Sequence, residues 1–164
     1  MKKQQFFCKE RLQPFLTVII LIMALPLLAA SFTDRGDGTV LDSASNLVWQ
    51  KCSMGLTSPA CTGTATSATW AAALTYCNTL TLSGRTWRLP NVNELSSLVD
   101  TTVTPAPAAI NNTIFPGTLA NFYWSSSTYV PVTANAWYVF FLDGSVGFSL
   151  KTVSSSVRCV STGP

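Results

Sequence analysis

Residues 69–99 read TWAAALTYCNTLTLSGRTWRLPNVNELSSLV, and this stretch decides the fold class. In its first half, apolar residues recur at the spacing of one helix face. This spacing predicts a helix over residues 69–81 with Thr69 at the N-cap position. The apolar positions of this helix are Trp70, Ala73, Leu74, Cys77 and Leu80.

A second, shorter helix is predicted after Pro90. Asn91 is followed three residues later by Glu94, which is the pattern of a capping box. In that motif each of the two side chains accepts a hydrogen bond from the backbone N–H of the other residue. The buried face of this helix would consist of Val92, Leu95, Leu98 and Val99.

Short strands are predicted on both sides of these helices. Asp143-Gly144 is a strong signal for a two-residue hairpin turn between two strands of the C-terminal third. Helices in the first half and strands in the second predict an α+β domain, with two helices packed on a mostly antiparallel sheet. The predicted strands are residues 39–41, 47–49, 136–142, 145–150 and 156–160.

Residues 100–131 lack helical periodicity and are interrupted by Pro105, Pro107 and Pro116. The sequence therefore predicts a long loop region here. Loops of this length in a compact domain often carry function. Binding residues also concentrate on loops held by a rigid scaffold, so we expect the ligand to contact this region and the adjoining hairpin.

The N-terminal residues have the layout of a secretory signal peptide. A basic, polar segment is followed by an apolar run from Phe15 to Ala30 that ends in small residues. A retained membrane anchor is the alternative, but this run contains Pro26 and is shorter than the roughly 20 residues that span a bilayer. We therefore expect cleavage after residues 1–30, an exported domain of residues 31–164, and membrane contact only through an uncleaved signal segment.

Charge is scarce and unevenly placed. Only 10% of the residues are charged, the net charge is +3, and His is absent. The positive surplus lies within residues 1–30, so the rest of the chain is formally neutral. A neutral domain has no nucleic-acid footprint. The lack of His excludes His-based triads and His metal sites.

Four cysteines follow the signal segment: Cys52, Cys61, Cys77 and Cys159. An even number in an exported domain predicts two disulfides, with three connectivities open. The paired short spacings of a zinc site are absent. A Cys52–Cys61 bridge would close a loop locally, whereas Cys77 and Cys159 could join the first helix to the last strand.

Aromatic and amide side chains in or beside the long loop are the candidate ligand contacts. Such residues give rigid or adaptable contacts in binding loops. Trp49, Trp70 and Trp87 lie in apolar patterns and are expected in the core. No cofactor or metal is expected, because the early Asp residues lack the spacing of a calcium loop. The candidate contacts are Tyr123, Trp124, Tyr129, Asn135 and Trp137.

Motifs along the chain resemble the domain at the C-terminus of the Legionella collagen-like adhesin, a family of exported bacterial domains similar to C-type lectin-like domains. The resemblance implies a lectin-like fold, a Cys77–Cys159 bridge, ligand contacts on the long-loop face, and adhesion or glycan binding. The neutral domain lacks the basic cluster that sulfated glycans would need. The matching stretches include residues 36–40, 47–52, 69–70, 76–78, 87–91, 94–95, 115–116, 123–126, 136–139, 143–144 and 157–160.

Two other functions compete with an adhesion module that binds a glycan or another surface ligand. One is a lectin-fold receptor of phage or retroelement origin with diversified loops. The other is an enzyme related to formylglycine-generating enzymes, which share a lectin-like fold but need reactive cysteines. We expect a binding module and no enzyme, because the four cysteines have structural uses. The ligand and the oligomeric state are left open.

Overall fold

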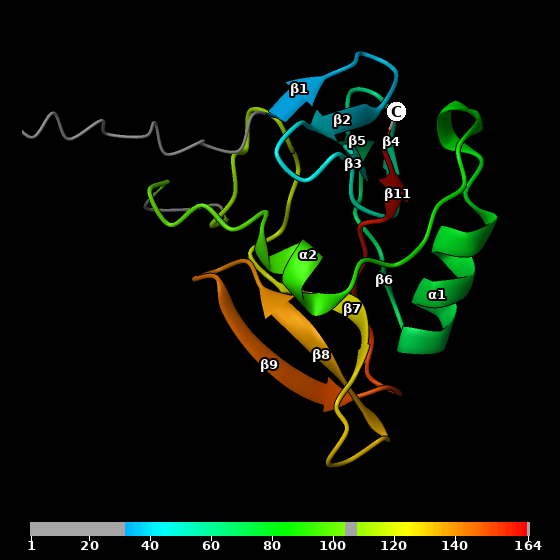
Figure 1. Cartoon of the computed structure of the whole chain (residues 1–164), viewed down its shortest axis with the longest axis vertical. Helices are drawn as coiled ribbons and strands as arrows, with labels where there is room; N and C mark the ends of the chain where they lie inside the picture. Colours follow the sequence, from blue (N-terminus) through cyan, green and yellow to red (C-terminus); the bar gives the residue numbers. More distant parts are fainter. Residues whose placement is uncertain (1–31, 104–107, 164) are drawn as a thin grey trace, which may run out of the picture.

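The computed structural model describes residues 32–103 and 108–163 (Figure 1). The predicted signal peptide, residues 1–30, lies outside the described residues. The described chain is an α+β domain that contains three β-sheets, and almost all strand pairs are antiparallel. The predicted α+β class is therefore confirmed.

The first sheet has four strands in the order β1-β2-β3-β11 and is antiparallel throughout. It joins the beginning of the domain to its end, because β11 pairs with β3. The predicted strands at residues 39–41 and 47–49 are confirmed by β2 and β3. The strands of this sheet are β1 (Phe32–Asp34), β2 (Thr39–Asp42), β3 (Leu47–Gln50) and β11 (Val160–Thr162).

The second sheet has five strands in the order β6-β10-β7-β8-β9. Its β10–β7 pair is parallel and the other pairs are antiparallel. The hairpin predicted from Asp143-Gly144 is present as β8–β9, but its turn comprises the four residues 141–144 rather than two, because β8 ends at Phe140, which pairs with Ser145. The strands are β6 (Ser67–Ala68), β7 (Phe122–Thr128), β8 (Asn135–Phe140), β9 (Ser145–Leu150) and β10 (Ser155–Ser156).

Strand β7 corrects the prediction that residues 100–131 form one long loop. Tyr123, Trp124 and Ser125 are all fully buried, and β7 is paired on both sides. A strand buried on both faces shows no alternation of apolar and polar residues, so the pattern concealed it. The predicted last strand, residues 156–160, is likewise divided between β10 and β11, which belong to different sheets.

Both predicted helices are present as α1 (Trp70–Thr79) and α2 (Val92–Ser96), and a 3-10 turn, η1 (Leu82–Gly84), follows α1. Both hydrogen bonds of the Asn91–Glu94 capping box are formed. Arg88 additionally binds both carboxylate oxygens of Glu94, at 2.7 and 2.6 Å. This short helix is thus fixed at its first turn.

The two disulfides are Cys52–Cys61 and Cys77–Cys159. The first closes the segment that holds the small β4–β5 hairpin (Leu56–Thr57 and Thr62–Gly63). The second joins α1 to the segment between β10 and β11, inside one of two buried apolar clusters. Both predicted pairings are confirmed.

Arg158 is a charged side chain with no exposed surface. Its Nη2 donates to Lys51 O, Ser53 Oγ and Thr118 Oγ1 at 3.2, 3.3 and 2.9 Å. Its guanidinium lies 4.8 Å from the centre of the Phe115 ring. Burial without a carboxylate lowers the pKa of Arg158 to about 10. Through its hydrogen bond to Thr118, Arg158 holds the long loop between α2 and β7 against the segment that contains Lys51 and Ser53.

Candidate ligand-binding surface

Two of the five candidate contacts belong to the core. Tyr123 and Trp124 have no exposed surface. The Tyr123 hydroxyl lies 2.8 Å from Ser53 Oγ and accepts a hydrogen bond from Leu119 N at 3.1 Å. The Trp124 indole N–H donates to Ala68 O at 3.1 Å. These rings hold the surrounding segments together, which removes them from the candidate contact surface.

Two of the three tryptophans expected in the core, Trp49 and Trp87, are buried. Trp70 is partly buried and packs against one of the two buried apolar clusters, so it has the expected packing role at the edge of the core. Its indole N–H donates to Ser125 O at 2.8 Å, and Lys151 Nζ lies 4.1 Å from its ring centre. Trp70 therefore links α1 to β7 from the edge of the core.

The other three candidate contacts gather at one end of the β7-β8-β9 sheet. Tyr129 directly follows β7, and its N–H donates to Asn135 O at 2.9 Å. Asn135 N donates to Val132 O at 2.8 Å. These bonds close residues 129–135 into a compact loop between β7 and β8. Asn135 takes part in this loop through its backbone N–H and C=O groups. Its side-chain Oδ1 is buried.

Tyr129, Trp137 and Phe148 form an aromatic cluster on this sheet, which we call the aromatic platform. Tyr129 and Phe148 stack with ring centres 3.9 Å apart and an interplanar angle of 7°. Trp137 meets both rings edge-on, at 5.2 and 5.9 Å. Phe148 is 45% exposed, and the other two rings are partly exposed. The platform thus presents aromatic surface to solvent from paired strands.

Sequence reasoning missed Phe148, although a signal for it was present. The β8–β9 register places Phe148 directly opposite Trp137. Counting outward from a two-residue turn at Asp143-Gly144 would have paired Phe148 with Val139, which is two residues from Trp137 and on the same face, because the loop in fact comprises residues 141–144. The sequence analysis did not ask which residues of the two hairpin strands share a face of the sheet, and that question would have placed Phe148 on the face of Trp137.

The surroundings of the platform are apolar rather than charged. Lys151 is the basic residue that follows β9, but its Nζ donates to Thr128 Oγ1 at 2.9 Å and lies over Trp70. Thr128 pairs with Ala136, and neighbouring residues on a strand point to opposite faces. Lys151 therefore lies on the face opposite Trp137. The neighbouring exposed apolar side chains are Val130, Val132, Val146 and Leu150.

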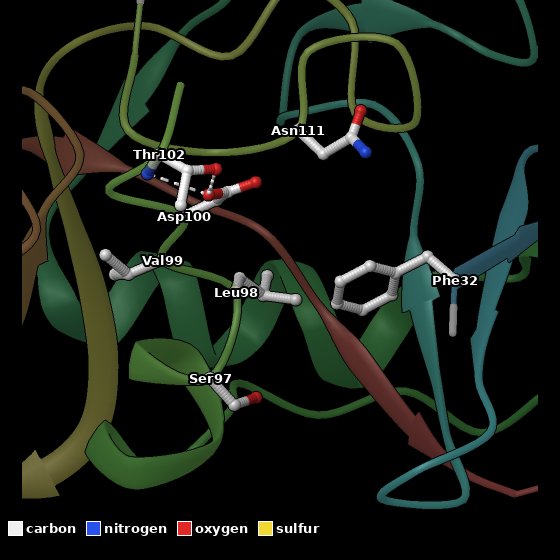
Figure 2. Close-up of a pocket in the computed structure, with 7 residues that line it drawn as sticks. All are labelled: Phe32, Ser97, Leu98, Val99, Asp100, Thr102 and Asn111. Carbon is white, nitrogen blue, oxygen red and sulfur yellow. Dashed lines mark hydrogen bonds between the residues drawn. The ribbon is translucent and has the colours of Figure 1, made fainter. Parts of the chain in front are cut away.

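Apart from the platform, a cleft lies between β1 and the segment that follows α2, as Figure 2 shows. This loop cleft has a volume of about 340 Å³. Figure 2 shows Phe32 and Leu98 pointing toward one another on its apolar side, with Asp100 and Asn111 across from them. The remaining lining residues are Ser97, Val99 and Thr102.

The polar groups of the loop cleft are partly used by the loop itself. Asp100 Oδ1 accepts hydrogen bonds from the hydroxyl and the N–H of Thr102, at 2.6 and 2.9 Å. These bonds lower the pKa of Asp100, so the carboxylate is ionised at neutral pH. Asn111 Oδ1 accepts from Thr113 N and Ile114 N, which leaves its NH₂ group as the donor.

Neither metal ligation nor a membrane span is found in the part of the chain that the structure describes. Residues 32–103 and 108–163 contain no group of three or more His, Cys, Asp or Glu side chains placed to hold a metal ion. No helix within those ranges has the length and apolar character needed to cross a bilayer. The two disulfides point to an oxidising compartment.

The comparison with known families agrees with this architecture. No curated protein sequence matches the chain. The model of one family, described as the Lcl C-terminal domain, matches residues 38–161. That range covers most of the chain and includes all four bridged cysteines, the capping box and the aromatic platform. The chain therefore belongs to the Lcl C-terminal domain family.

Proposed function

We propose that this chain is an exported adhesion module that binds a glycan on its aromatic platform. The observation that carries the proposal is the Tyr129–Phe148 stack with Trp137 at its edge, partly exposed on paired strands. The face of an aromatic ring carries partial negative charge, which attracts the C–H groups on the face of a pyranose ring. A fixed pair of stacked rings can hold such a face without losing side-chain freedom on binding.

A lectin-like fold and export are parts of the same proposal. The Cys77–Cys159 bridge joins the longer helix to the chain just before the last strand, which is the pairing that a C-type lectin-like domain would have. The platform also lies beside the segment 129–135, on the predicted long-loop face. An oxidising compartment suits an exported protein that meets glycans outside the cell.

The charge around the platform favours a neutral or weakly charged glycan. Lys151 is the nearest basic residue along β9, and its ammonium group is held on the opposite face by Thr128 and Trp70. A sulfated chain would need several accessible cations. Binding should therefore depend weakly on ionic strength, because few charge pairs are available for salt to screen.

The loop cleft offers polar contacts to the same class of ligand. The Asp100 carboxylate accepts hydrogen bonds, the Asn111 amide donates them, and Phe32 and Leu98 provide an apolar wall. Pockets for small ligands combine an apolar lining with a few polar groups in this way. We propose the cleft as a secondary site, where a sugar hydroxyl would meet Asp100.

The two competing functions have less support. An enzyme of the formylglycine-generating kind would need a reactive cysteine, and Cys52, Cys61, Cys77 and Cys159 are all bridged. A diversified receptor would vary exposed loop residues, whereas the platform draws Trp137 and Phe148 from paired strands. We therefore propose binding without turnover.

A matched pair of phenylalanine variants tests the platform. Phe148 on β9 and Phe122 on β7 are 45% and 37% exposed. Phe122 belongs to a different aromatic group, with Tyr138 and Phe140, on the opposite face of the sheet. The exported wild-type chain is first screened on a glycan array. Phe148→Ala should then weaken binding of the best glycan by about tenfold, the loss typical of an energetically important contact.

Phe122→Ala is the control and should leave the affinity unchanged. Equal losses in the two variants would contradict the assignment of the platform, and so would normal binding by Phe148→Ala. Asp100→Asn in the same titration measures the contribution of the loop cleft. Conversion of any arrayed glycan by the wild-type chain would overturn the proposal that the protein has no catalytic activity.

A further inference from the structure

Strand β9 is the outer strand of the five-stranded sheet, and within residues 32–103 and 108–163 no other strand pairs with its outer edge. It reads SVGFSL over Ser145–Leu150, without a charged residue or a proline. Natural proteins normally shield such an edge with charges, proline, a bulge or a covering segment. The β8–β9 register runs without a bulge, and β9 lies at the outside of the described chain in Figure 1.

The backbone groups on this edge follow from the hydrogen bonds to β8. Lys151 N–H donates to Ala134 O at 2.9 Å, immediately beyond the paired residues. Bonded and non-bonded pairs alternate along an antiparallel ladder, so the odd-numbered residues of β9 bond to β8. Val146 and Phe148 therefore direct their N–H and C=O groups to the free edge. Leu150 directs its N–H there, whereas its C=O accepts a hydrogen bond from Val153 N at 2.9 Å.

The same three residues carry the exposed apolar side chains of the strand. Val146, Phe148 and Leu150 are 46%, 45% and 53% exposed. Side chains two residues apart lie on the same face of a sheet. The outward backbone groups and one apolar row thus belong to the same three residues, which is the arrangement that an additional strand would use.

We propose that β9 pairs antiparallel with β9 of a second copy of this chain, about a two-fold axis at Phe148. In this register Phe148 lies opposite Phe148 of the second copy, and each Val146 lies opposite Leu150. The unpaired backbone groups of Val146 and Phe148 and the N–H of Leu150 then find partners, and the C=O of Leu150 accepts a second hydrogen bond beside the one from Val153 N. The contact is self-complementary, as a two-fold interface must be, and one apolar row continues into the other.

The charges at the ends of the strand do not oppose this register. Asp143 precedes β9, and Lys151 follows it. In the proposed pair, Lys151 lies opposite Ser145 of the second copy, two positions from that copy's Asp143. The Lys151 ammonium is held by Thr128 and Trp70, so it forms no charge pair across the interface. The paired residues Ser145–Leu150 are uncharged, so no like charges face each other along the strand.

The pairing also bears on the proposed glycan function. A two-fold axis perpendicular to the sheet leaves the same face of both copies on one side, so two aromatic platforms would meet at their Phe148 rings. A long glycan chain could then contact both platforms and gain avidity over a short one. This consequence rests on the proposed function, whereas the pairing itself does not.

Sedimentation velocity over a dilution series tests the pairing with two valine variants. Val146 lies on the free edge, whereas Val132 lies in the 129–135 loop. The two are 46% and 49% exposed, so Val132→Lys is a matched control for Val146→Lys. The wild-type chain should shift from the mass of one chain to that of two as its concentration rises. Val146→Lys should raise the dissociation constant at least tenfold, because the symmetry introduces the charge twice.

A backbone variant tests the hydrogen bonds separately. Val146→Pro removes an N–H that points away from β8, and proline is tolerated at such positions of edge strands. It should also dissociate the pair while leaving the circular dichroism spectrum unchanged. Wild-type chain that keeps the mass of one chain at the highest concentration would overturn the proposal. Equal weakening by Val132→Lys and Val146→Lys would also overturn it.

Glycan binding distinguishes this inference from the proposed function. If both hold, wild-type chain prefers long over short forms of the same glycan, and Val146→Lys loses this preference but still binds the short form. Glycan binding by a chain that never pairs would overturn the pairing alone. Pairing that depends on Val146, without glycan binding, would support the pairing and contradict the proposed function.

Discussion

The two disulfides should contribute unequally to stability, because they close loops of very different length. Cys77 and Cys159 are 82 residues apart, whereas Cys52 and Cys61 are nine apart. In the chain-entropy account, the longer loop corresponds to about 4.5 kcal/mol and the shorter to about 2.6 kcal/mol at 25 °C. Replacing Cys77 and Cys159 by alanine should therefore lower the free energy of unfolding by about 2 kcal/mol more than replacing Cys52 and Cys61.

Packing acts in the same direction. Cys77 and Cys159 lie in a buried apolar cluster, whereas Cys61 is partly exposed. Removal of the two buried sulfur atoms would also leave a small cavity, which adds to the cost. Urea denaturation of both double variants and of wild type, followed by tryptophan fluorescence and circular dichroism, gives the three free energies. An equal or larger loss on removal of Cys52–Cys61 would refute the argument from loop length.

Local signals made the helices and the hairpin predictable. The capping box of α2 depends on Asn91 and Glu94 alone, and its two hydrogen bonds form between residues three apart. The Asp143-Gly144 turn likewise requires only a left-handed glycine, and Gly144 has φ of 81°. Structural features whose hydrogen bonds join residues a few positions apart can therefore be predicted without knowing the rest of the fold.

Strand β7 and the aromatic residues around it could not be assigned in this way. Tyr123 and Tyr129 are the same residue type on the same segment, yet only Tyr129 reaches the surface. The register of β7 against β8 shifts between Trp124 and Thr128. An irregularity of this kind redirects the side chains that follow it, and single-strand periodicity does not reveal it. The identity of the buried rings depends on the partner strands.

The buried Arg158 had no signal in the sequence. Arginine in a short terminal strand is expected at the surface. Its hydrogen-bond acceptors, Lys51 O, Ser53 Oγ and Thr118 Oγ1, come from segments far away along the chain. Only the closed fold brings them to one point, so neither the burial nor the role of this residue in holding the long loop could be anticipated.

Two further predictions concern charged groups that stabilise the fold. Hydrogen bonds from Arg88, and to a smaller extent from Asn91 N–H, hold the pKa of Glu94 below its usual value. The stability that Glu94 contributes is therefore fully present above the pKa of the unfolded state, and it is lost as the pH falls through the lower pKa of the folded state. Glu94→Gln removes the carboxylate that pairs with Arg88, while the amide oxygen can still accept from Asn91 N–H. It should destabilise the domain by up to about 1 kcal/mol at pH 7, and the difference from wild type in urea denaturation should shrink in acid. Arg158→Met removes three hydrogen bonds, but it also removes a fully buried charge that has no carboxylate partner. Replacing a buried charge by an apolar side chain of similar volume often changes the free energy of unfolding very little. The free energy of unfolding should change by less than about 2 kcal/mol, while amide hydrogen exchange around Thr118 should become faster because the loop has lost its attachment. A much larger loss of stability, with unchanged exchange at Thr118, would mean that Arg158 supports the core rather than the loop.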